Sequence, residues 1–424
     1  MRRPRGTRDL FGLELESVRK VMYIMNGIFK RYGYVEVETP IFEHLELFTK
    51  KSGASVVNQI YAFQDKSGRW LALRPELTAP VVRFYLERLK SFPKPLKLFY
   101  FGSCFRYEEP QAGRYRQFLQ SGAEIIGSSR PEADAEVIAL VDDIAKELGL
   151  RGYDLRVGNV GLLREILSQA GVKGEEQDPV MRAIDAHDQA RLEEELDRRG
   201  VGERYKRLLK TVAGLQGGVE VLDKAGELLS DLSKARAALQ RLRAVLRLLE
   251  LSGVDGYRVD LGIARGLEYY TDVVFELYVD GVQVAGGGRY DELIELLGGE
   301  PCPAVGVGFG VDRIAQAMLK QGVKIEEWQL DCMVLPSSGE MLDECLKIAR
   351  DLRRAGLSVD VDLMGRSLRK AIAYADARRA RYAVIVGARD LASGKVTLRN
   401  MTTGEQELVS REELANKLKE VRAT

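Results

Sequence analysis

The pattern of apolar residues changes character along the chain, and this limits the protein to a multidomain fold with both helices and strands. A first amphipathic stretch is followed by short β-type runs up to residue 170, and such runs return at 229–324. Residues 171–228 are rich in Glu, Arg, Lys, Leu and Ala and lack strand-like runs, which predicts short helices. After residue 330, strand-like and helix-like stretches alternate.

These changes predict an α+β protein made of four segments. Residues 1–170 and 229–324 form two parts of one core, and 171–228 is a helical insertion between them. Residues 330–424 form a separate, compact α/β domain. The length of 424 residues agrees with two or three domains, because one domain takes roughly 150 residues.

The composition excludes several classes of protein. A formal net charge of +1, with 45% hydrophobic and 30% charged residues, is typical of a soluble globular chain rather than a disordered one. No apolar run approaches the roughly 20 residues that a membrane helix needs. The basic start, Met1 to Gly6, leads into no apolar segment. We therefore expect a cytoplasmic protein with no membrane partner.

Cysteine and histidine usage narrows the possible chemistry. The four cysteines are far apart and form no CxxC pair, which argues against a disulfide framework or a structural zinc site. Only two histidines are present, His44 and His187, so a histidine base or a histidine-rich metal site is disfavoured. We predict no metal site made of protein side chains and chemistry based on arginines, carboxylates and positioning.

The small net charge conceals a difference between the two ends of the chain. Residues 1–329 carry 47 basic and 49 acidic side chains, whereas residues 330–424 carry 17 and 14. Six basic residues and one acid lie within sixteen positions of the C-terminal part. The six are Arg366, Arg369, Lys370, Arg378, Arg379 and Arg381. A solvated helix face and a nucleic-acid contact both fit this cluster.

The densest functional signal lies between Phe105 and Gln120, where two strand-like segments flank a loop rich in arginine and glutamate. Strand alternation places Arg106 and Glu108 on one face of the first segment. On the second, one face carries Phe118, Gln120, Gly122 and Glu124. Guanidinium groups suit phosphate because their planar fork makes paired, charge-assisted hydrogen bonds. An exposed charged hairpin is the alternative.

Three further segments combine glycine with arginine or tyrosine. The run Ala264–Thr271 could place a cation and hydroxyl groups over a small polar ligand, or pack tyrosines in a core with Arg265 reaching outward. The glycines of 286–288 allow a close approach to a ligand, or form a turn. The glycine spacing of Val305–Arg313 invites a dinucleotide interpretation, but no βαβ unit surrounds it. A glycine-lined strand leading to Arg313 fits a triphosphate better.

Together these segments resemble, in order, spacing and residue type, the motifs of class II aminoacyl-tRNA synthetases, and closely those of the histidyl-tRNA synthetase family. The helix and strand that end at Pro40 resemble the first class motif, Phe105–Glu124 the second and Gly306–Arg313 the third. The family's own segments also have counterparts, which are Leu73–Pro80, Arg265–Tyr270, Ala285–Tyr290 and, in the C-terminal domain, Val384–Gly387 and Asn400–Glu405.

The resemblance implies a fold and a reaction. The fold is an antiparallel sheet flanked by helices, with a helical insertion and a C-terminal α/β anticodon-binding domain. The reaction ligates L-histidine to its tRNA through a histidyl-adenylate, with ATP as the second substrate, Mg²⁺ accompanying it, and pyrophosphate and AMP as products. The resemblance also implies a homodimer, and it directs the basic cluster, chiefly Arg366, Arg369, Lys370 and Arg378, to tRNA.

The resemblance assigns roles to individual residues as well. Arg106 and Arg265 would act on the α-phosphate from two sides, Arg313 would hold the γ-phosphate, Glu108 would lie near the adenine, and Arg114 would sit in the loop. The ligands of the amino acid would be Glu76, Thr78, Arg106, Gln120, Glu124, Arg265, Tyr269 and Tyr270. Within that set Glu124 and Tyr270 would read the two imidazole nitrogens, which offer a donor and an acceptor.

A few residues depart from the commoner bacterial pattern. Leu119 stands where many bacterial members carry a histidine, and Leu77, Ala79, Pro80 and Glu268 also differ. These differences favour an archaeal-type or divergent bacterial member. The competing class is a non-catalytic paralogue that serves as a regulatory subunit of ATP phosphoribosyltransferase. That paralogue generally lacks the anticodon-binding domain and the arginine signature, and both are present here. A pure RNA-binding protein would not need the three arginines.

Overall fold

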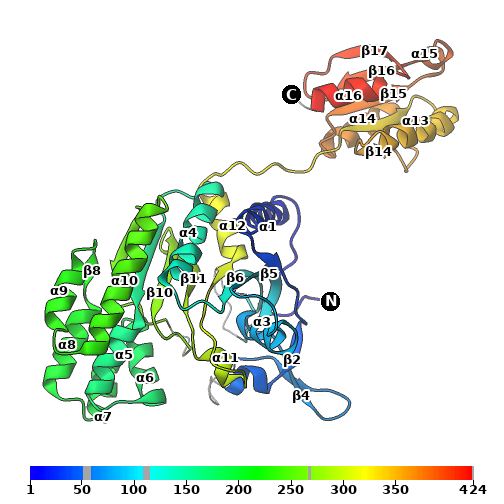
Figure 1. Ribbon diagram of the computed structural model, residues 1–424. Coiled ribbons are helices and arrows are strands. Elements are labelled where there is room, and N and C mark those ends of the chain that lie inside the picture. Colours follow the sequence, from blue (N-terminus) through cyan, green and yellow to red (C-terminus); the bar gives the residue numbers. More distant parts are fainter. Residues whose placement is uncertain (51–58, 108–114, 266–268, 423–424) are drawn as a thin grey trace. The chain divides into compact units, whose positions relative to one another are not determined.

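In a computed structural model the chain forms two compact units, Met1–Ile325 and Glu326–Thr424, and each is described by itself. The structure describes residues 1–50, 59–107, 115–265 and 269–422. Figure 1 shows helices and strands in both units. Within the described residues no helix is long and apolar enough to cross a membrane.

A nine-stranded sheet forms the centre of the first unit. Its strands are β1 (Val35–Glu36), β5 (Leu96–Phe105), β6 (Gln117–Ile126), β7 (Asp154–Asn159), β8 (Gln216–Gly217), β9 (Tyr257–Asp260), β10 (Val273–Val279), β11 (Val282–Arg289) and β12 (Ala304–Gly310). Their order is β1-β5-β6-β12-β11-β10-β7-β9-β8. From β5 to β7 every pairing is antiparallel, as expected, but β1 with β5 and β7 with β9 are parallel. The sheet is therefore mixed at its edges.

The dipeptide Asp280-Gly281 between two strand-like runs predicts a two-residue hairpin turn, and the structure confirms it between β10 and β11. Asp280 and Gly281 have φ angles of 49° and 78°, the left-handed conformation that such a hairpin turn requires. Asp tolerates this conformation better than most residues, and Gly adopts it without steric cost.

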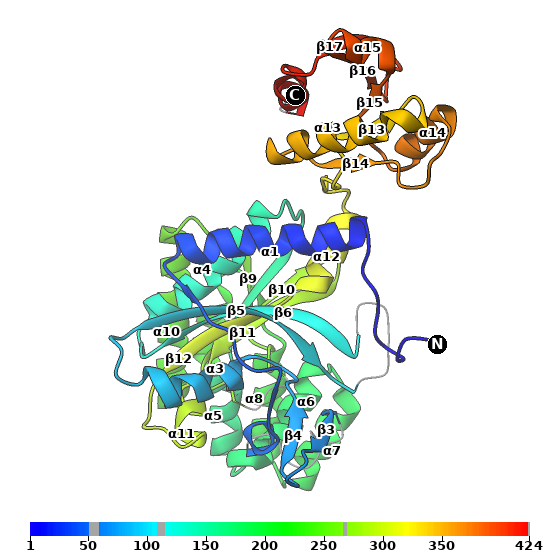
Figure 2. The same cartoon turned by 90° about the vertical axis from the view of Figure 1, so that its right-hand side faces the viewer.

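One face of the sheet is apolar and covered by helices. These are α1 (Leu13–Arg31), α4 (Pro131–Glu147) and α12 (Val311–Lys320). Figure 2 shows α1 running across this face. Phe29 of α1 lies 4.8 Å, centroid to centroid, from Phe99 of β5 and 6.3 Å from Phe309 of β12. Because side chains alternate along a strand, the neighbours of Phe99 and Phe309 point to the opposite face, which contains the site.

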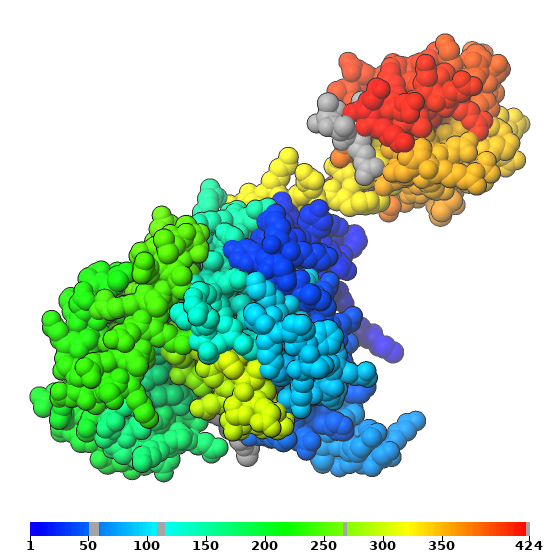
Figure 3. Space-filling model, in the orientation of Figure 1, coloured from blue at the N-terminus to red at the C-terminus, as the bar shows by residue number. Residues whose placement is uncertain are grey.

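Helices between residues 160 and 251 form one side of the first unit, the green surface in Figure 3. They are α5 (Val160–Gln169), η2 (Gly174–Gln177), α6 (Asp178–Asp185), α7 (Gln189–Arg198), α8 (Glu203–Ala213), α9 (Val221–Leu228) and α10 (Ser233–Leu251). The sequence predicts the helices of 171–228 but not β8, whose two residues pair with β9 at the sheet edge. Two residues are too few to produce a strand pattern.

A smaller sheet and short helices complete the first unit. The three strands β2 (Phe42–His44), β3 (Ala62–Gln64) and β4 (Trp70–Leu73) pair in the order β2-β4-β3. The short helices are α3 (Thr78–Phe84), η1 (Tyr85–Leu89) and α11 (Leu293–Leu296). The turn between β4 and α3 places Glu76 and Thr78 at the site.

The second unit is a five-stranded sheet with helices. Its strands are β13 (Cys332–Pro336), β14 (Val359–Val361), β15 (Tyr382–Val386), β16 (Lys395–Asn400) and β17 (Gln406–Ser410), in the order β14-β13-β15-β16-β17. Its helices are η3 (Gly339–Met341), α13 (Leu342–Arg354), α14 (Leu368–Ala377), α15 (Ala388–Ala392) and α16 (Leu414–Arg422). The sequence does not predict β17, an edge strand in which only Val409 is buried, because it lacks apolar alternation.

A buried ion pair joins the central sheet to α4. The Arg289 side chain, at the end of β11, is fully buried, and its Nε donates to Asp134 Oδ1 over 2.8 Å. The remaining guanidinium hydrogens reach Asp291 and the Ser128 carbonyl, and Asp134 also accepts from Arg241. Every charge is thus paired, and removing Arg289 would leave the fully buried Asp134 with Arg241 as its remaining cationic partner.

We therefore expect Arg289→Ala to lower the free energy of unfolding by about 3–5 kcal/mol, the cost of breaking a buried pair. Arg198→Ala is the control, because Arg198 pairs with Glu194 at 3.1 Å on the exposed face of α7. Urea denaturation of the full chain measures both. Equal stability of the two variants would contradict a structural role for the buried pair.

Candidate active site

Glycines occupy the middle of the sheet on the face opposite α1. Two rows of cross-strand neighbours run over this face. One row joins Glu124 of β6, Gly306 of β12 and Gly288 of β11. The other joins Tyr100, Gly122, Gly308, Gly286 and Glu276 on five successive strands. The glycines leave the centre of this face without side chains. The polar residues Tyr100, Glu124 and Glu276 stand at the ends of the two rows.

Functional side chains fill the space that these glycines leave. A Cβ atom on Gly306 would lie 1.5 Å from Oε2 of Glu124, and one on Gly286 would lie 1.7 Å from Nη1 of Arg265. Real Cβ atoms do not approach other atoms so closely. The glycine runs that the sequence analysis singled out are therefore needed so that a carboxylate and a guanidinium can lie flat on the sheet.

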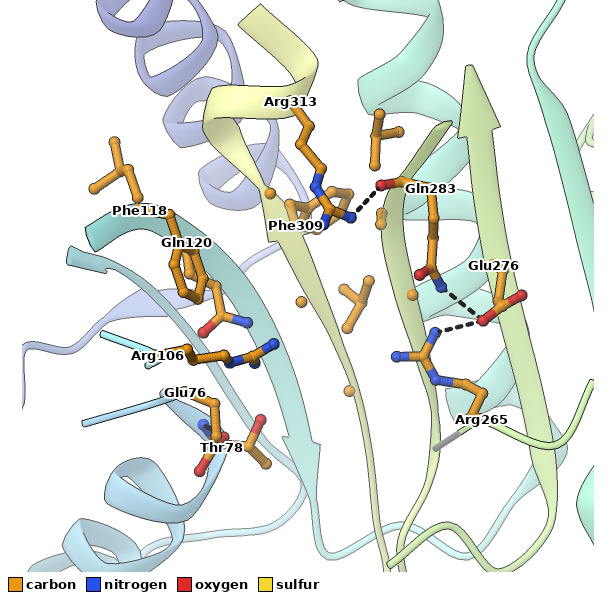
Figure 4. Close-up of a pocket in the computed structure, with 18 of the residues that line it drawn as sticks. Glu76, Thr78, Arg106, Phe118, Gln120, Arg265, Glu276, Gln283, Phe309 and Arg313 are labelled. Carbon is orange, nitrogen blue, oxygen red and sulfur yellow. Dashed lines mark hydrogen bonds and ion pairs between the residues drawn. The ribbon is translucent and has the colours of Figure 1, made fainter. Parts of the chain in front are cut away.

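A cavity of about 370 Å³ lies over this surface. It brings together nine of the predicted site residues, which are Glu76, Thr78, Arg106, Gln120, Glu124, Arg265, Tyr269, Tyr270 and Arg313. Glu108 and Arg114 lie outside the described residues. Arg366, Arg369, Lys370 and Arg378 belong to the second unit. Figure 4 shows Arg106 and Arg265 on opposite walls of the cavity, with Arg313 at one end.

A buried carboxyl group, Glu124, lies at the inner end of the cavity. It is 1% exposed and accepts hydrogen bonds from the hydroxyls of Tyr100, over 2.8 Å, and Tyr290. Burial raises the pKa of Glu124 to about 8, although the tyrosine hydrogen bonds oppose the shift. A carboxyl group in this position can accept a hydrogen bond from an N–H group of a ligand.

A second carboxyl group, Glu76, is held at the start of α3. Its oxygens accept from the backbone N–H of Thr78, over 2.5 Å, and of Ala79, over 3.0 Å. Burial raises the pKa of Glu76, while these two N–H groups and the charge of Arg106 act in the opposite direction. In Figure 4 Glu76, Thr78 and Gln120 lie near Arg106 on the same wall.

Three guanidinium groups border the rest of the cavity. Arg106 donates from Nε to the Pro75 carbonyl over 2.9 Å, and Arg313 donates from Nη1 to the Gln283 carbonyl over 2.8 Å. Arg265 pairs with Glu276 at 3.2 Å, and its buried Nε has no hydrogen-bond partner among the described residues. Three cations around one cavity suit a polyanion such as a triphosphate.

Several residues of the site were not predicted from the sequence. Glu276, a buried acid in the otherwise apolar β10, accepts from Arg265, Tyr278 and Gln283 and so fixes the Arg265 guanidinium. Tyr290 is hydrogen-bonded to Glu124, and the centroid of the Tyr270 ring lies 5.2 Å from the Arg265 guanidinium. The feature of the sequence that could have identified Glu276 is its place as a lone acid within a β-type run. No local signal pointed to Tyr100 as a partner of Glu124.

The architecture now defines a class of protein. The antiparallel sheet contains the long β5–β6 hairpin, and Arg106 directly follows β5 where the connecting loop begins. The glycine-lined strand β12 pairs with β6 and leads into α12, which contains Arg313. This is the catalytic domain of a class II aminoacyl-tRNA synthetase.

Comparisons with known proteins identify the family. The histidyl-tRNA synthetase family model matches residues 6–314, and the model of the anticodon binding domain matches 331–421. The histidine–tRNA ligase of Methanocaldococcus jannaschii is 45% identical over 416 residues, 98% of both chains. The chain belongs to the histidyl-tRNA synthetase family. Members of this family use ATP to charge tRNA with histidine through an aminoacyl-adenylate.

Solved structures agree with this assignment. The histidyl-tRNA synthetase of Nostoc sp. PCC 7120 superposes with a TM-score of 0.81 at 26% identity, over 99% of both chains. A Bacillus halodurans protein described as an ATP phosphoribosyltransferase regulatory subunit/histidyl-tRNA synthetase gives a TM-score of 0.77 at 27% identity, over 91% of this chain and 97% of that one. The description of the Bacillus halodurans protein names both the regulatory subunit and the enzyme, so the fold alone does not separate them.

The contact between Gly306 and Glu124 generates a first prediction for the site. Gly306→Ala should displace the Glu124 carboxyl group and reduce histidine-dependent activity by roughly 100-fold or more, as small misplacements in active sites do. Gly27→Ala is the control, because its Cβ would meet nothing within 4 Å on helix α1. Activity assays of both variants check this, and wild-type activity in Gly306→Ala would contradict it.

The raised pKa of Glu124 generates a prediction about stability. Because burial raises this pKa from 4.5 to about 8, the folded protein holds an extra proton between these pH values. The free energy of unfolding therefore falls as pH rises through this window, and Glu124→Gln removes that loss. We expect the Tm of Glu124→Gln, relative to wild type, to increase between about pH 5.5 and about pH 8. Glu292→Gln, at an exposed position, is the control.

Proposed function

We propose that the inner part of the cavity binds histidine and that the arginine-lined part binds ATP. The observation that carries this proposal is that one cavity is bordered both by carboxyl groups, among them Glu76 and Glu124, and by three guanidinium groups. A zwitterionic amino acid next to a triphosphate needs both kinds of group, because its ammonium group binds acids while its carboxylate and the phosphates bind cations.

In this arrangement Glu124 and Tyr270 contact the imidazole, with Tyr269 and Tyr290 close by. Glu76, Thr78 and Gln120 bind the α-amino group. A pocket with buried polar partners rejects amino acids that leave those partners unsatisfied. The hydroxyl of Tyr290 already donates to Glu124, and it therefore fixes the direction in which the carboxyl group is presented.

The same arrangement supports adenylate formation without a histidine base. The carboxylate of the amino acid attacks the α-phosphate, and pyrophosphate leaves. Arg106 and Arg265 stabilise the charge that develops on the α-phosphoryl oxygens, while Arg313 holds the γ-phosphate. Glu108 and Arg114 complete the adenine and loop contacts of the proposal. The ribose hydroxyl of the tRNA then takes the histidyl group and releases AMP.

Magnesium enters the proposal with ATP. Among the described residues no group of three or more His, Cys, Asp or Glu side chains could hold a metal ion. The carboxylate of Glu276, which lines the cavity, already accepts hydrogen bonds from Arg265, Tyr278 and Gln283. Mg²⁺ commonly binds through substrate phosphates and water with one or two carboxylates. The phosphates of ATP would therefore supply most of its ligands.

The second unit binds the tRNA in this proposal. Arg369 and Lys370 are exposed at the start of α14 and suit phosphate contacts. Arg366 instead pairs with Asp362 and lies over the Tyr374 ring at 4.0 Å, and Arg378 lies 3.5 Å from Asp360. Arg366 and Arg378 would therefore contact RNA while still paired with these aspartates. We further propose a homodimer that works in the cytoplasm.

Histidine-dependent exchange between ATP and pyrophosphate, followed by charging of total tRNA, tests the proposal. The wild-type chain should catalyse both steps, and Glu124→Ala should lose about 10⁴ in kcat/KM for histidine. Arg369→Ala, in the second unit, should keep exchange and weaken tRNA binding with a reduced salt dependence. A chain without exchange activity would support the regulatory paralogue instead.

A further inference from the structure

The N-terminal segment contacts the side of the proposed ATP site. Arg8 forms an ion pair with Asp312, the residue before Arg313 in the first turn of α12. The pair is largely buried, since the side chains are 15% and 6% exposed. The other oxygen of Asp312 accepts a hydrogen bond from the backbone N–H of Leu119 over 2.6 Å. Asp312 therefore links three segments that are far apart in the sequence.

The same N-terminal segment also contacts the β5–β6 hairpin, at the point where β5 ends and β6 begins. The Gly6 carbonyl accepts from the backbone N–H of Arg116 over 2.8 Å, and the Arg116 carbonyl accepts from that of Arg106 over 3.0 Å. The Arg8 guanidinium lies 4.1 Å from the centroid of the Tyr115 ring. The Tyr115 hydroxyl accepts from Nε2 of Gln316 in α12 over 3.0 Å.

These contacts converge on two of the arginines assigned to ATP. Arg106 stands at the end of β5, on one side of the contacts, and Arg313 stands next to Asp312 on the other. The backbone of Leu119, which Asp312 holds, adjoins Gln120 in the cavity wall. If Arg8 were absent, Asp312 would keep the Leu119 hydrogen bond but lose its ion pair with Arg8, and its buried charge would lose that compensation.

We propose that Arg8 is a positioning residue for ATP, because its ion pair with Asp312 sets the distance between the Arg106 hairpin and the Arg313 helix. This inference rests on the proposed ATP-binding roles of those two arginines. The imidazole contacts proposed for Glu124 and Tyr270 do not involve the ion pair. Loss of Arg8 should therefore impair the use of ATP much more than the use of histidine.

The test is Arg8→Met in the full chain, with the KM values for ATP and histidine measured separately by pyrophosphate exchange. Methionine keeps an unbranched side chain of similar reach and removes the charged guanidinium group that lies over the Tyr115 ring. We expect kcat/KM for ATP to fall roughly 10- to 100-fold, the size of effect that small misplacements produce, and KM for histidine to change much less. Arg8→Lys, which keeps the charge without the planar fork, should fall between Arg8→Met and wild type.

Arg3→Met is the matched control, because Arg3 lies in the same segment and pairs at 3.6 Å with Asp9 on the surface. It should match wild type. A second cycle, with Asp312→Asn, tests the pair itself, since the Arg8→Met change should cost less in that background. Unchanged kcat/KM for ATP in Arg8→Met would overturn the inference, as would equal rises in both KM values with a lowered Tm, which mark general destabilisation. A wild-type chain inactive in exchange would instead contradict the proposed function.

Discussion

The glycine-lined centre of the sheet is the constraint on which the site depends. Glu124 and Arg265 lie flat on the sheet only because Gly306 and Gly286 have no side chains. Glycine in a strand costs stability, because it offers nothing to pack and loses more entropy on folding. The opposite face compensates, since Phe99 and the other large side chains there pack under α1, α4 and α12. Because side chains alternate along each strand, the residues that pack the core lie on one face of the sheet and the residues of the site lie on the other.

The sequence carries much of this architecture, but not the part that depends on register. The first amphipathic helix, the helices of residues 171–228, the Asp280–Gly281 turn and the glycine strand leading to Arg313 follow from local patterns and are confirmed. Whether Glu124 meets Gly306 depends on how β6 pairs with β12, about 180 residues away, and no local pattern encodes that pairing. Edge strands β8 and β17 were missed for the opposite reason, because they are short or exposed and carry no pattern.

The electrostatics of the cavity explain why a nearly neutral chain can bind a polyanion. The balance of 64 basic and 63 acidic residues says little, because the fold sorts the charges locally. Buried acids at Glu76 and Glu124 both have raised pKa values, since burial penalises their charge. Guanidinium groups stay charged under the same conditions. The cavity is therefore more positive than its residue count suggests, until a cationic or N–H-donating ligand favours the ionised acids.

Two buried carboxylates, Asp134 and Asp312, join the parts of the first unit in the same way. Asp134 accepts from Arg289 and Arg241, and Asp312 accepts from Arg8 and the Leu119 backbone. Neither pair is an efficient source of stability, because both charges lose their hydration. Their hydrogen bonds are directional, however, whereas an apolar contact of equal volume would allow the two segments to shift relative to each other. A site assembled from segments distant in sequence needs that directionality more than it needs additional stability, and this accounts for buried charge at both junctions.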